Sequence, residues 1–258
     1  MAKNQRIIKL KSVRNVRTLA GLTGADGRRI KENILLRSAA LSTFTAEDRR
    51  VLTEQYGLTT VVDLRTEDEV RKAPDLTEGL IYNYLPICRD TIPGVSREAE
   101  PGKHVTIEML PDLRDMYRDV VSGEEFIEAF SLAVKTIIHH RDGAILWHCT
   151  EGKDRCGLTA MFVLSVLGVS EAQIIEDYML TNLSAKKKAR KTYFLIRFLK
   201  RDKALAQKVH DVYIVDKEYI GAAIAAINEK FGGMDRYIHE KLGISDEEIS
   251  EFREYALM

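Results

Sequence analysis

The sequence predicts an α/β fold, in which a central, mostly parallel sheet is flanked by helices and a helical C-terminal portion follows. Three observations predict it. Short β-branched or apolar runs lie in the first half, helical periodicity dominates residues 170–258, and one strand–loop–helix unit at residues 144–167 joins the two parts. With 258 residues, of which 45% are hydrophobic, the chain can form one domain over residues 1–258 with a substantial core.

Composition and charge exclude several classes of function. The 39 basic and 39 acidic residues cancel, so we expect no nucleic-acid partner. No apolar run approaches the roughly 20 residues of a membrane span, so we expect no stable membrane insertion. Residues 1–11 lack the apolar stretch of a signal peptide, and three scattered cysteines do not form a disulfide framework. A cytoplasmic protein is expected, and the composition does not predict its oligomeric state.

The first elements alternate short strands with a helix. Residues 15–19 and 34–38 are short runs on either side of a polar turn at residues 24–27, which predicts two strands. Thr45 is a favourable N-cap residue and Gly57 is a favourable C-cap residue, so we expect a helix between them.

Two more strands and an irregular stretch follow. Residues 59–65 give the strongest strand prediction of the first half, because they are short and β-branched. Residues 81–87 predict another strand, and Pro86 places it at a sheet edge or a strand end. Residues 88–111 then lose all periodicity, so residues 88–121 are predicted to contain a lid or an insertion.

Capping boxes and apolar stripes predict the remaining helices. Ser122, Ser170 and Ser245 each stand three residues before a Glu or Gln, which is the capping-box pattern. Apolar residues at helical spacing follow each of them. Residues 170–258 are therefore expected to form a helical C-terminal part.

One stretch carries the chemistry: His148-Cys149-Thr150-Glu151-Gly152-Lys153-Asp154-Arg155-Cys156-Gly157. Residues 144–147 before it predict a buried strand, and residues 158–167 after it predict a buried helix. Five residues between Cys149 and Arg155 leave enough backbone to wrap one tetrahedral oxyanion. Loop amides and the helix N-terminus would favour that anion and the thiolate form of Cys149. Arg155 offers a planar fork of donors to two phosphate oxygens.

The His-Cys-x5-Arg pattern of residues 148–155, with its Gly-Lys-Asp-Arg ending, resembles the signature of cysteine-dependent phosphatases. More narrowly, it is similar to that of the bacterial atypical protein tyrosine phosphatase family. The Asn-x-Arg-x-Leu pattern of residues 15–19, Arg37-Ser38 and Asp63-Leu64-Arg65 resemble further elements of this family. The resemblance implies a cysteine-phosphatase-like fold and hydrolysis of phosphotyrosine in proteins, with phosphoserine, phosphothreonine and phosphoinositides as further substrates.

The hypothesis is a hydrolysis in two steps that needs neither a metal nor a cofactor. Cys149 attacks phosphorus and forms a phosphocysteine, which water then hydrolyses. Loop amides and Arg155 would stabilise the charge on the phosphoryl oxygens. His148 is expected to steady the loop through the backbone rather than to transfer protons. The predicted phosphate-binding residues are Thr150, Glu151, Gly152, Lys153, Asp154 and Arg155.

The leaving oxygen needs a proton, so the site needs a general acid. The chain lacks a Trp-Pro-Asp motif, because its single tryptophan, Trp147, directly precedes the signature. The resemblance implies that Asp154 is the acid. Asp112, beside the predicted lid, is the alternative, and Asp115 is a weaker one.

Several neighbouring residues have two interpretations each. Asp63 and Arg65, at a predicted strand end, either brace the phosphate loop or only form an ion pair. Lys153 either meets a second phosphate or an acidic flank of the substrate, or faces solvent. The basic run at residues 186–191 is either a solvated helix face or a surface that approaches an anionic membrane.

Cys156 departs from the pattern that the resemblance implies, which has threonine or serine after the arginine. A thiol is a weaker hydrogen-bond donor than a hydroxyl, so breakdown of the phosphocysteine would be slower. If this thiol faces Cys149, the two sulfurs could form a disulfide that protects the nucleophile from over-oxidation. The alternative is a neutral or engineered substitution.

Two other functions stay open. A phosphate-binding pseudophosphatase would keep the loop and lose turnover, and other folds use a loop cysteine for sulfur or arsenate chemistry. Cys149 and Arg155 are both present at the required spacing, which favours a phosphatase. The expected partner is therefore a phosphoprotein or phosphoinositide substrate.

Overall fold

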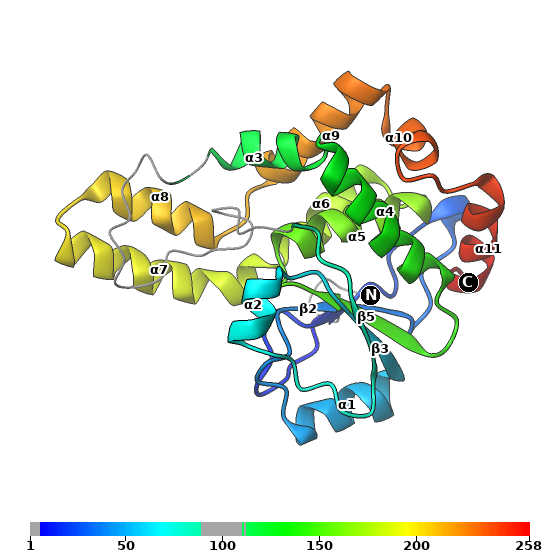
Figure 1. Cartoon of the computed structure of the whole chain (residues 1–258), viewed down its shortest axis with the longest axis horizontal. Helices are drawn as coiled ribbons and strands as arrows, with labels where there is room; N and C mark the ends of the chain where they lie inside the picture. The colour runs from blue at the N-terminus through cyan, green and yellow to red at the C-terminus, as the bar shows by residue number, and fades with distance from the viewer. Residues whose placement is uncertain (1–5, 89–109, 111) are drawn as a thin grey trace.

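The computed structural model describes residues 6–88, 110 and 112–258 (Figure 1). Within these residues, five strands form one sheet in the order β1-β2-β5-β3-β4. Strand β1 is antiparallel to β2, and the other three pairings are parallel. The predicted, mostly parallel sheet is therefore confirmed. The strands are β1 Arg17–Thr18, β2 Leu35–Ser38, β3 Leu58–Asp63, β4 Ile81–Tyr84 and β5 Ala144–His148.

Helices lie on both sides of this sheet (Figure 1). Helix α1 lies on one side, and α4 and α5 lie on the other. A short 3₁₀ helix, Ala25–Gly27, precedes β2. The α-helices are α1 Ala46–Tyr56, α2 Glu67–Lys72, α3 Leu113–Val120, α4 Glu124–His139, α5 Asp154–Val166, α6 Glu171–Met179, α7 Asn182–Leu199, α8 Lys203–Tyr213, α9 Lys217–Phe231, α10 Met234–Glu240 and α11 Asp246–Ala256.

The central strand β5 is buried on both faces. Ile145 and Trp147 point into the larger apolar cluster, and Ala144 and Leu146 point into a smaller cluster that contains Leu52 of α1. Successive side chains of a strand point to opposite faces, so β5 separates two cores and is held by both. This burial fixes the end of β5, where His148 leads into the phosphate loop.

Helix α5, which follows the loop, is a core helix, as predicted for residues 158–167. Each of its residues except Ser165 is buried. It begins at Asp154, so the last residues of the signature already belong to its first turn. The loop therefore connects two buried elements that have little freedom to move apart.

The three predicted capping boxes have different outcomes. Ser245 forms its box with Glu248 at the start of α11. Ser170 occupies the N-cap of α6, but its side chain makes no cap hydrogen bond. At α4 the prediction is wrong, because Gly123 is the N-cap and the hydroxyl of Ser122 donates to a carbonyl of α3.

The predicted lid or insertion at residues 88–121 is described in part. Residues 89–109 and 111 lie outside the described residues, so the lid prediction is not tested there. The end of the range forms α3, which packs against α9. This helix is amphipathic, and its buried side chains are Leu113, Met116, Tyr117 and Val120.

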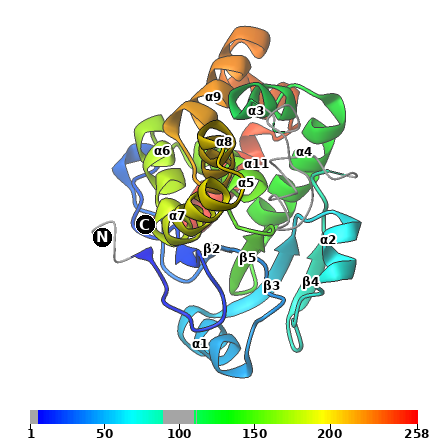
Figure 2. The same ribbon diagram turned by 90° about the vertical axis from the view of Figure 1, so that its left-hand side faces the viewer.

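The C-terminal part contains α6 to α11, which confirms its predicted helical character. Helices α7 and α8 pack along each other and project from the rest of the helices (Figures 1 and 2). None of the helices in the described ranges combines the length and the apolar character that crossing a bilayer requires.

Candidate active site

The signature cysteine lies in a five-residue loop, Cys149–Lys153, between β5 and α5. The flanking strands β2 and β3 are parallel to β5, and their last residues, Ser38 and Asp63, are in register with His148. Segments that leave three neighbouring parallel strands therefore meet at one edge of the sheet, where ligands bind in open α/β folds.

Hydrogen bonds hold the loop carbonyls on its outer side. The side-chain amide of Asn15 donates to the carbonyls of Glu151 (3.0 Å) and Gly152 (2.9 Å). The backbone amide of Ala40 donates to the carbonyl of Thr150 (3.2 Å). No described peptide bond is cis, so the N–H that follows each carbonyl points the opposite way. These amides are therefore directed toward the inside of the loop, as an oxyanion site requires.

Gly152 is the loop residue that only glycine fits. Its φ is +68°, a left-handed conformation that side chains disfavour. A Cβ at this position would lie 2.3 Å from the carbonyl oxygen of Ser38. Glycine therefore lets the loop pass close to the end of β2, where Arg37 also donates to the Gly152 carbonyl at 3.0 Å.

Arg155, the predicted phosphate clamp, is completely buried. Its Nη1 and Nη2 donate to the carboxylate of Glu69 at 2.6 and 2.8 Å, and Nη1 also donates to the carbonyl of Leu64 at 3.3 Å. A guanidinium has five N–H donors. Among the described residues Nε has no partner, so Nε and the second N–H of Nη2 leave one edge open. That edge matches two oxygens of an oxyanion.

The sequence pattern did not reveal Glu69, which is central to this arrangement. It closes a capping box with Thr66 at the start of α2, and the hydroxyl of Thr150 donates to its carboxylate. Burial alone would raise the pKa of Glu69, but the hydrogen bonds and charge of Arg155 outweigh burial and lower it. The Thr-x-x-Glu pattern was a visible signal of the box, and it carries no information about Arg155.

Residues 8–258 match the profile of a family described as the tyrosine phosphatase family. The chain belongs to this family. A phosphatase function follows from that membership, and it agrees with the amide-lined loop and the open edge of Arg155.

Three relatives of this phosphatase have related names. A candidate tyrosine-protein phosphatase of Cupriavidus necator is 28% identical over 246 residues, which cover 90% of this chain and 83% of that protein. The tyrosine-protein phosphatase of Nostoc commune is 27% identical and covers 87% of this chain and 74% of its own length. The triple specificity protein phosphatase PtpB of Mycobacterium tuberculosis is 26% identical, with coverage of 85% and 89%.

A solved structure also aligns with this phosphatase. The crystal structure of TpbA from P. aeruginosa covers 84% of this chain and 97% of that chain, at 16% identity and a TM-score of 0.34.

Asp154, the predicted general acid of the phosphatase, is buried in the first turn of α5. Its Oδ1 accepts a 2.6 Å hydrogen bond from the hydroxyl of Tyr117, and that hydroxyl lies 2.6 Å from the hydroxyl of Tyr178. Burial raises the pKa of Asp154, and the opposing effects of Lys153, Tyr117 and Arg155 do not cancel it. A carboxyl group with a raised pKa holds its proton to higher pH, which suits a general acid.

The alternative acid, Asp112, has a different environment. It is exposed, caps the N-terminus of α3 and forms a 3.3 Å ion pair with Arg114. The hydrogen bonds from Arg114 lower the pKa of Asp112, so its ionised form is favoured.

Lys153 is buried, so the interpretation that it faces solvent is wrong. Its ammonium group donates to the carbonyl of Val212 on α8 and lies 3.5 Å from Oδ2 of Asp154. Helix α8 covers this position, which the local sequence pattern does not show. Lys153 therefore links the phosphate loop to α8 and supplies a charge beside Asp154.

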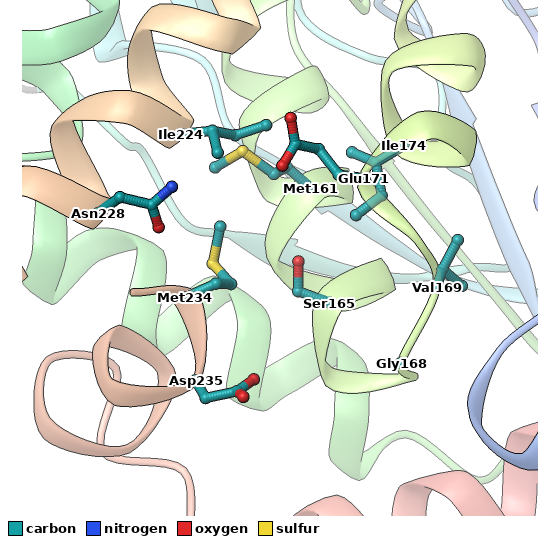
Figure 3. A pocket seen from close by; sticks show the side chains of 10 residues that line it. All are labelled: Met161, Ser165, Gly168, Val169, Glu171, Ile174, Ile224, Asn228, Met234 and Asp235. Atoms are coloured by element: carbon teal, nitrogen blue, oxygen red, sulfur yellow. The ribbon is translucent and has the colours of Figure 1, made fainter. Parts of the chain in front are cut away.

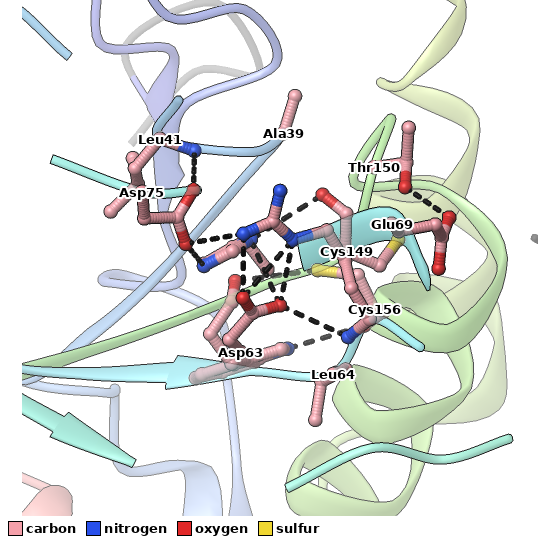
Figure 4. Close-up of polar contacts among 12 residues, drawn as sticks. Ala39, Leu41, Asp63, Leu64, Glu69, Asp75, Cys149, Thr150 and Cys156 are labelled. Carbon is pink, nitrogen blue, oxygen red and sulfur yellow. Dashed lines mark hydrogen bonds and ion pairs between the residues drawn. The ribbon is translucent and has the colours of Figure 1, made fainter. Parts of the chain in front are cut away.

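Asp63 and Arg65 form the predicted ion pair, and the pair reaches the loop through His148. Arg65 Nη2 lies 2.6 Å from Asp63 and 2.9 Å from Asp75. Figure 4 shows polar contacts of Asp63 and Asp75. His148 Nε2 lies 2.9 Å from Asp75, and its Nδ1 lies 3.4 Å from the carbonyl of Cys149. Burial would raise the pKa of Asp63, but His148 and Arg65 lower it to about 2.

The same network contains the group of potential metal ligands that the described residues offer: Asp63, Asp75 and His148. Arg65 already places a positive charge within 2.6 Å and 2.9 Å of the two carboxylates. A divalent cation would have to displace this buried guanidinium. The arrangement therefore fits an ion-pair network better than a metal site.

A second buried network lies behind the loop, around Asp177 of α6. The carboxylate of Asp177 lies 2.6 Å from Arg6, 3.2 Å from Arg17 and 2.9 Å from Arg37. One negative and three positive charges give this cluster a net charge of +2. Burial and repulsion between neighbouring arginines lower the pKa of Arg17 to about 10, so it stays charged near neutrality. The excess of positive charge in this cluster favours the binding of an anion in the phosphate loop. The partners are Arg6, Arg17 and Arg37.

Cys156 is completely buried, and its sulfur lies 3.5 Å from the carbonyl of Trp147 and 3.9 Å from that of Ser38. Burial raises the pKa of Cys156 to about 11, so it is a thiol near neutrality. Cys88 is a second buried thiol, and it interacts electrostatically with Arg155 and Cys149. All three cysteines are free. Figure 4 shows Cys149 and Cys156 at the junction of loop and helix.

A cavity of about 230 Å³ lies away from this loop, between α5, α6, α9 and α10 (Figure 3). It contains none of the predicted site residues. Its lining is Met161, Ser165, Gly168, Val169, Glu171, Ile174, Ile224, Asn228, Met234 and Asp235.

Proposed function

We propose that this protein is a metal-independent phosphate-monoester hydrolase that works through a phosphocysteine on Cys149. The observation that carries the proposal is the open edge of Arg155 beside inward-facing loop amides. Burial would lower the pKa of Arg155, but Glu69 and the sulfur of Cys149 outweigh it and raise the pKa. Cys149 therefore contributes to the electrostatic environment of Arg155, as a shared phosphate site requires.

In the first step, the sulfur of Cys149 attacks phosphorus, and a P–S bond forms as the ester P–O bond breaks. Asp154 gives its proton to the leaving oxygen, which departs as an alcohol or phenol. Arg155 and the amides of the loop stabilise the charge on the remaining phosphoryl oxygens. The buried Tyr117 hydroxyl keeps the Asp154 carboxyl in place.

In the second step, water attacks phosphorus and the P–S bond breaks. The Asp154 carboxylate takes a proton from this water, so that phosphate leaves and the Cys149 thiolate and the Asp154 acid are restored. His148, whose ring contacts the carbonyl of Cys149 and Asp75, positions the start of the loop and transfers no proton.

The proposed substrates are phosphotyrosine in proteins, with phosphoserine, phosphothreonine and phosphoinositides as further substrates. The name of the mycobacterial relative, a triple specificity protein phosphatase, supports a broad range. Lys153 was the candidate for a second phosphate of the substrate. Since its ammonium is buried against Val212 and Asp154, we propose that it supports α8 and the acid instead.

The first experiment measures turnover of an aryl phosphate with and without a metal chelator. We expect turnover in both conditions, and we expect Cys149→Ser to abolish it, whereas Cys88→Ser retains it. Equal turnover by Cys149→Ser would contradict the mechanism. Phosphate binding without turnover in the unchanged protein would instead indicate a pseudophosphatase, and arsenate reduction or sulfur transfer would indicate the other chemistry.

The second experiment tests the general acid through leaving groups of different basicity. Asp154→Ala should lower the turnover of poor leaving groups far more than that of good ones, and Asp112→Ala should not. If the dependence on the leaving group is unchanged in Asp154→Ala, Asp154 is not the acid. A panel of phosphopeptides and phosphoinositides then ranks the substrates.

A further inference from the structure

Helix α7 exposes an unusual amount of apolar surface. Of the eleven large hydrophobic side chains exposed among the described residues, five lie on this helix. Phe198 is 81% exposed and Phe194 57% exposed, so two aromatic rings face water on one projecting element. The five are Leu183, Phe194, Leu195, Phe198 and Leu199.

The same helix is strongly basic. Its 18 residues contain six Lys or Arg and no Asp or Glu, whereas basic and acidic residues are equal in number over the whole chain. Lys200 and Arg201 extend the basic character past its C-terminus. The six are Lys186, Lys187, Lys188, Arg190, Lys191 and Arg197.

Apolar and basic side chains share one face of α7. Positions 183, 187, 190, 194 and 198 follow the spacing of three and four residues that aligns side chains along a helix. All five are exposed. The opposite side packs on α8, where the ring of Tyr193 contacts the ring of His210 and Ala189 is buried. Arg190 and Phe194 border α8, because they line a small cavity with Gln207 and His210. The face as a whole nevertheless stays exposed.

The base of the α7–α8 hairpin rests on the phosphate loop. Lys188 of α7 forms a 2.9 Å ion pair with Glu151 in the loop, and Glu151 also pairs with Arg14 at 3.0 Å. On the other helix, the carbonyl of Val212 accepts a hydrogen bond from Lys153. Whatever binds the outer face of α7 is therefore held near the loop.

We propose that the outer face of α7 docks on an anionic lipid bilayer. Its apolar side chains would enter the region between headgroups and acyl chains, and its cations would meet lipid phosphates. This goes beyond the proposed function, because docking needs no catalysis. It agrees with the expectation of no stable membrane insertion, since the helix lies on the surface and does not cross it.

Charge distribution favours a lipid surface over a protein partner. Protein interfaces have cores depleted of lysine, whereas Lys187 lies within this face, between Leu183 and Phe194. A bilayer accepts such a mixture because long basic side chains reach the headgroups while aromatic rings lie deeper. The face is also on a projecting hairpin (Figures 1 and 2), which suits a flat surface.

The experiment is co-sedimentation of the full chain with vesicles of phosphatidylcholine alone or mixed with phosphatidylserine. We expect binding to the anionic vesicles only, and weaker binding as salt rises. Two double variants, Phe194→Ser with Phe198→Ser and Lys187→Glu with Arg190→Glu, should each weaken binding by about tenfold or more. Cys149→Ser should bind like the unchanged protein, which separates docking from catalysis.

Matched controls use exposed side chains elsewhere. Leu132→Ser on α4, and Lys217→Glu with Lys230→Glu on α9, should bind like the unchanged protein. Aryl phosphate turnover should be retained by both α7 double variants, which shows that they fold. Equal binding to neutral vesicles, or no loss in the α7 variants, overturns the proposal. Self-association that depends on Phe194 and Phe198, without vesicle binding, also overturns it and assigns the face to a second copy.

Discussion

The carboxylate of Glu69 binds both terminal nitrogens of Arg155, at 2.6 and 2.8 Å. This pair fixes the plane of the guanidinium and, within the described residues, leaves its Nε edge open, where we propose that the phosphate binds. Glu69→Gln keeps the size of the side chain but loses the charge, so Arg155 would be held less firmly.

We expect Glu69→Gln to lower kcat/KM for an aryl phosphate by about ten- to a hundredfold, as misplacement of a catalytic group does. The matched control is Glu67→Gln, an exposed carboxylate on the same helix. Steady-state kinetics of the two variants make the comparison. Unchanged kcat/KM in Glu69→Gln would show that Arg155 is positioned without its partner.

Asn15 is predicted to shape the loop through its two hydrogen bonds to loop carbonyls. Asn15→Asp keeps the shape and the tolerance for its φ of +57° but cannot donate, so the carbonyls of Glu151 and Gly152 lose a donor. We expect kcat/KM to fall by at least about tenfold, and stability to fall by about 1–3 kcal/mol. Both are measured on the purified variant, by kinetics and by urea unfolding.

The control for this prediction is Asn33→Asp. Asn33 has the same type of backbone conformation, with φ of +59°, and is exposed. Asn33→Asp should change neither kcat/KM nor the free energy of unfolding. Equal behaviour of the two variants would mean that the conformation at residue 15 matters and its hydrogen bonds do not.

Tyr117→Phe should change the pH dependence of turnover. The hydroxyl of Tyr117 donates to Asp154 and lowers the pKa of that carboxyl, against the larger effect of burial, which raises it. Removing the donor raises the pKa further, so Asp154 stays protonated to higher pH. In a plot of kcat against pH, the fall of kcat at alkaline pH should therefore move to higher pH. Tyr219→Phe, whose ring packs on Tyr117 at 6.0 Å, is the control, and an alkaline limb that moves the other way contradicts the assignment.

Asp177 should link stability to pH. Burial would raise the pKa of Asp177, but the three arginines lower it from 3.8 to about 2. A lowered pKa in the folded state gives stability that is complete above the unfolded pKa and is lost as pH falls from about 4 toward 2. Asp177→Asn leaves the buried arginines uncompensated and should cost about 3–5 kcal/mol at neutral pH.

Urea unfolding at pH 7 and at pH 3 measures both effects. The loss of stability between these pH values should be smaller in Asp177→Asn than in the unchanged protein. Asp119→Asn, an exposed carboxylate of α3, should behave like the unchanged protein. An equal pH dependence in Asp177→Asn would show that other carboxylates dominate acid unfolding.

The sequence predicted the parts of this site that are local in the chain. Cys149, the loop and Arg155 lie in one contiguous stretch, so their spacing and the flanking apolar runs were enough to predict strand, loop and helix. The strands of the sheet were also predicted from contiguous runs, which are short and rich in β-branched residues. These predictions depend on neighbours along the chain and need no knowledge of tertiary packing.

The supporting residues could not be predicted because they act over long sequence distances. Glu69 belonged to a capping-box pattern, and Asn15 belonged to a predicted strand and to the Asn-x-Arg-x-Leu pattern, but neither pattern shows a contact with the phosphate loop. Tyr117 looked like the margin of an irregular stretch, yet it binds Asp154. Lys153 was open to a solvent-facing interpretation because nothing local shows that α8 covers it. Tertiary packing determines the contacts of all four residues.

The last prediction concerns the two buried thiols near Cys149. Hydrogen peroxide would convert the Cys149 thiol to a sulfenic acid and release water. A neighbouring thiol would then attack this sulfur, and a second water would leave as the disulfide forms. Burial raises the pKa of Cys156 and of Cys88 to about 11, so both attack slowly near neutrality. We expect a slow Cys149–Cys156 linkage, with activity restored by dithiothreitol.

Mass spectrometry of peptides after mild peroxide identifies the partner. Cys156→Ser should lose both the linkage and the recovery of activity, and Cys88→Ser should keep them. A linkage that persists in Cys156→Ser and disappears in Cys88→Ser would assign the protective role to Cys88. Direct conversion of Cys149 to sulfinic acid in the unchanged protein would show that neither thiol protects it, and that Cys156 serves only as a buried donor to the carbonyl of Trp147.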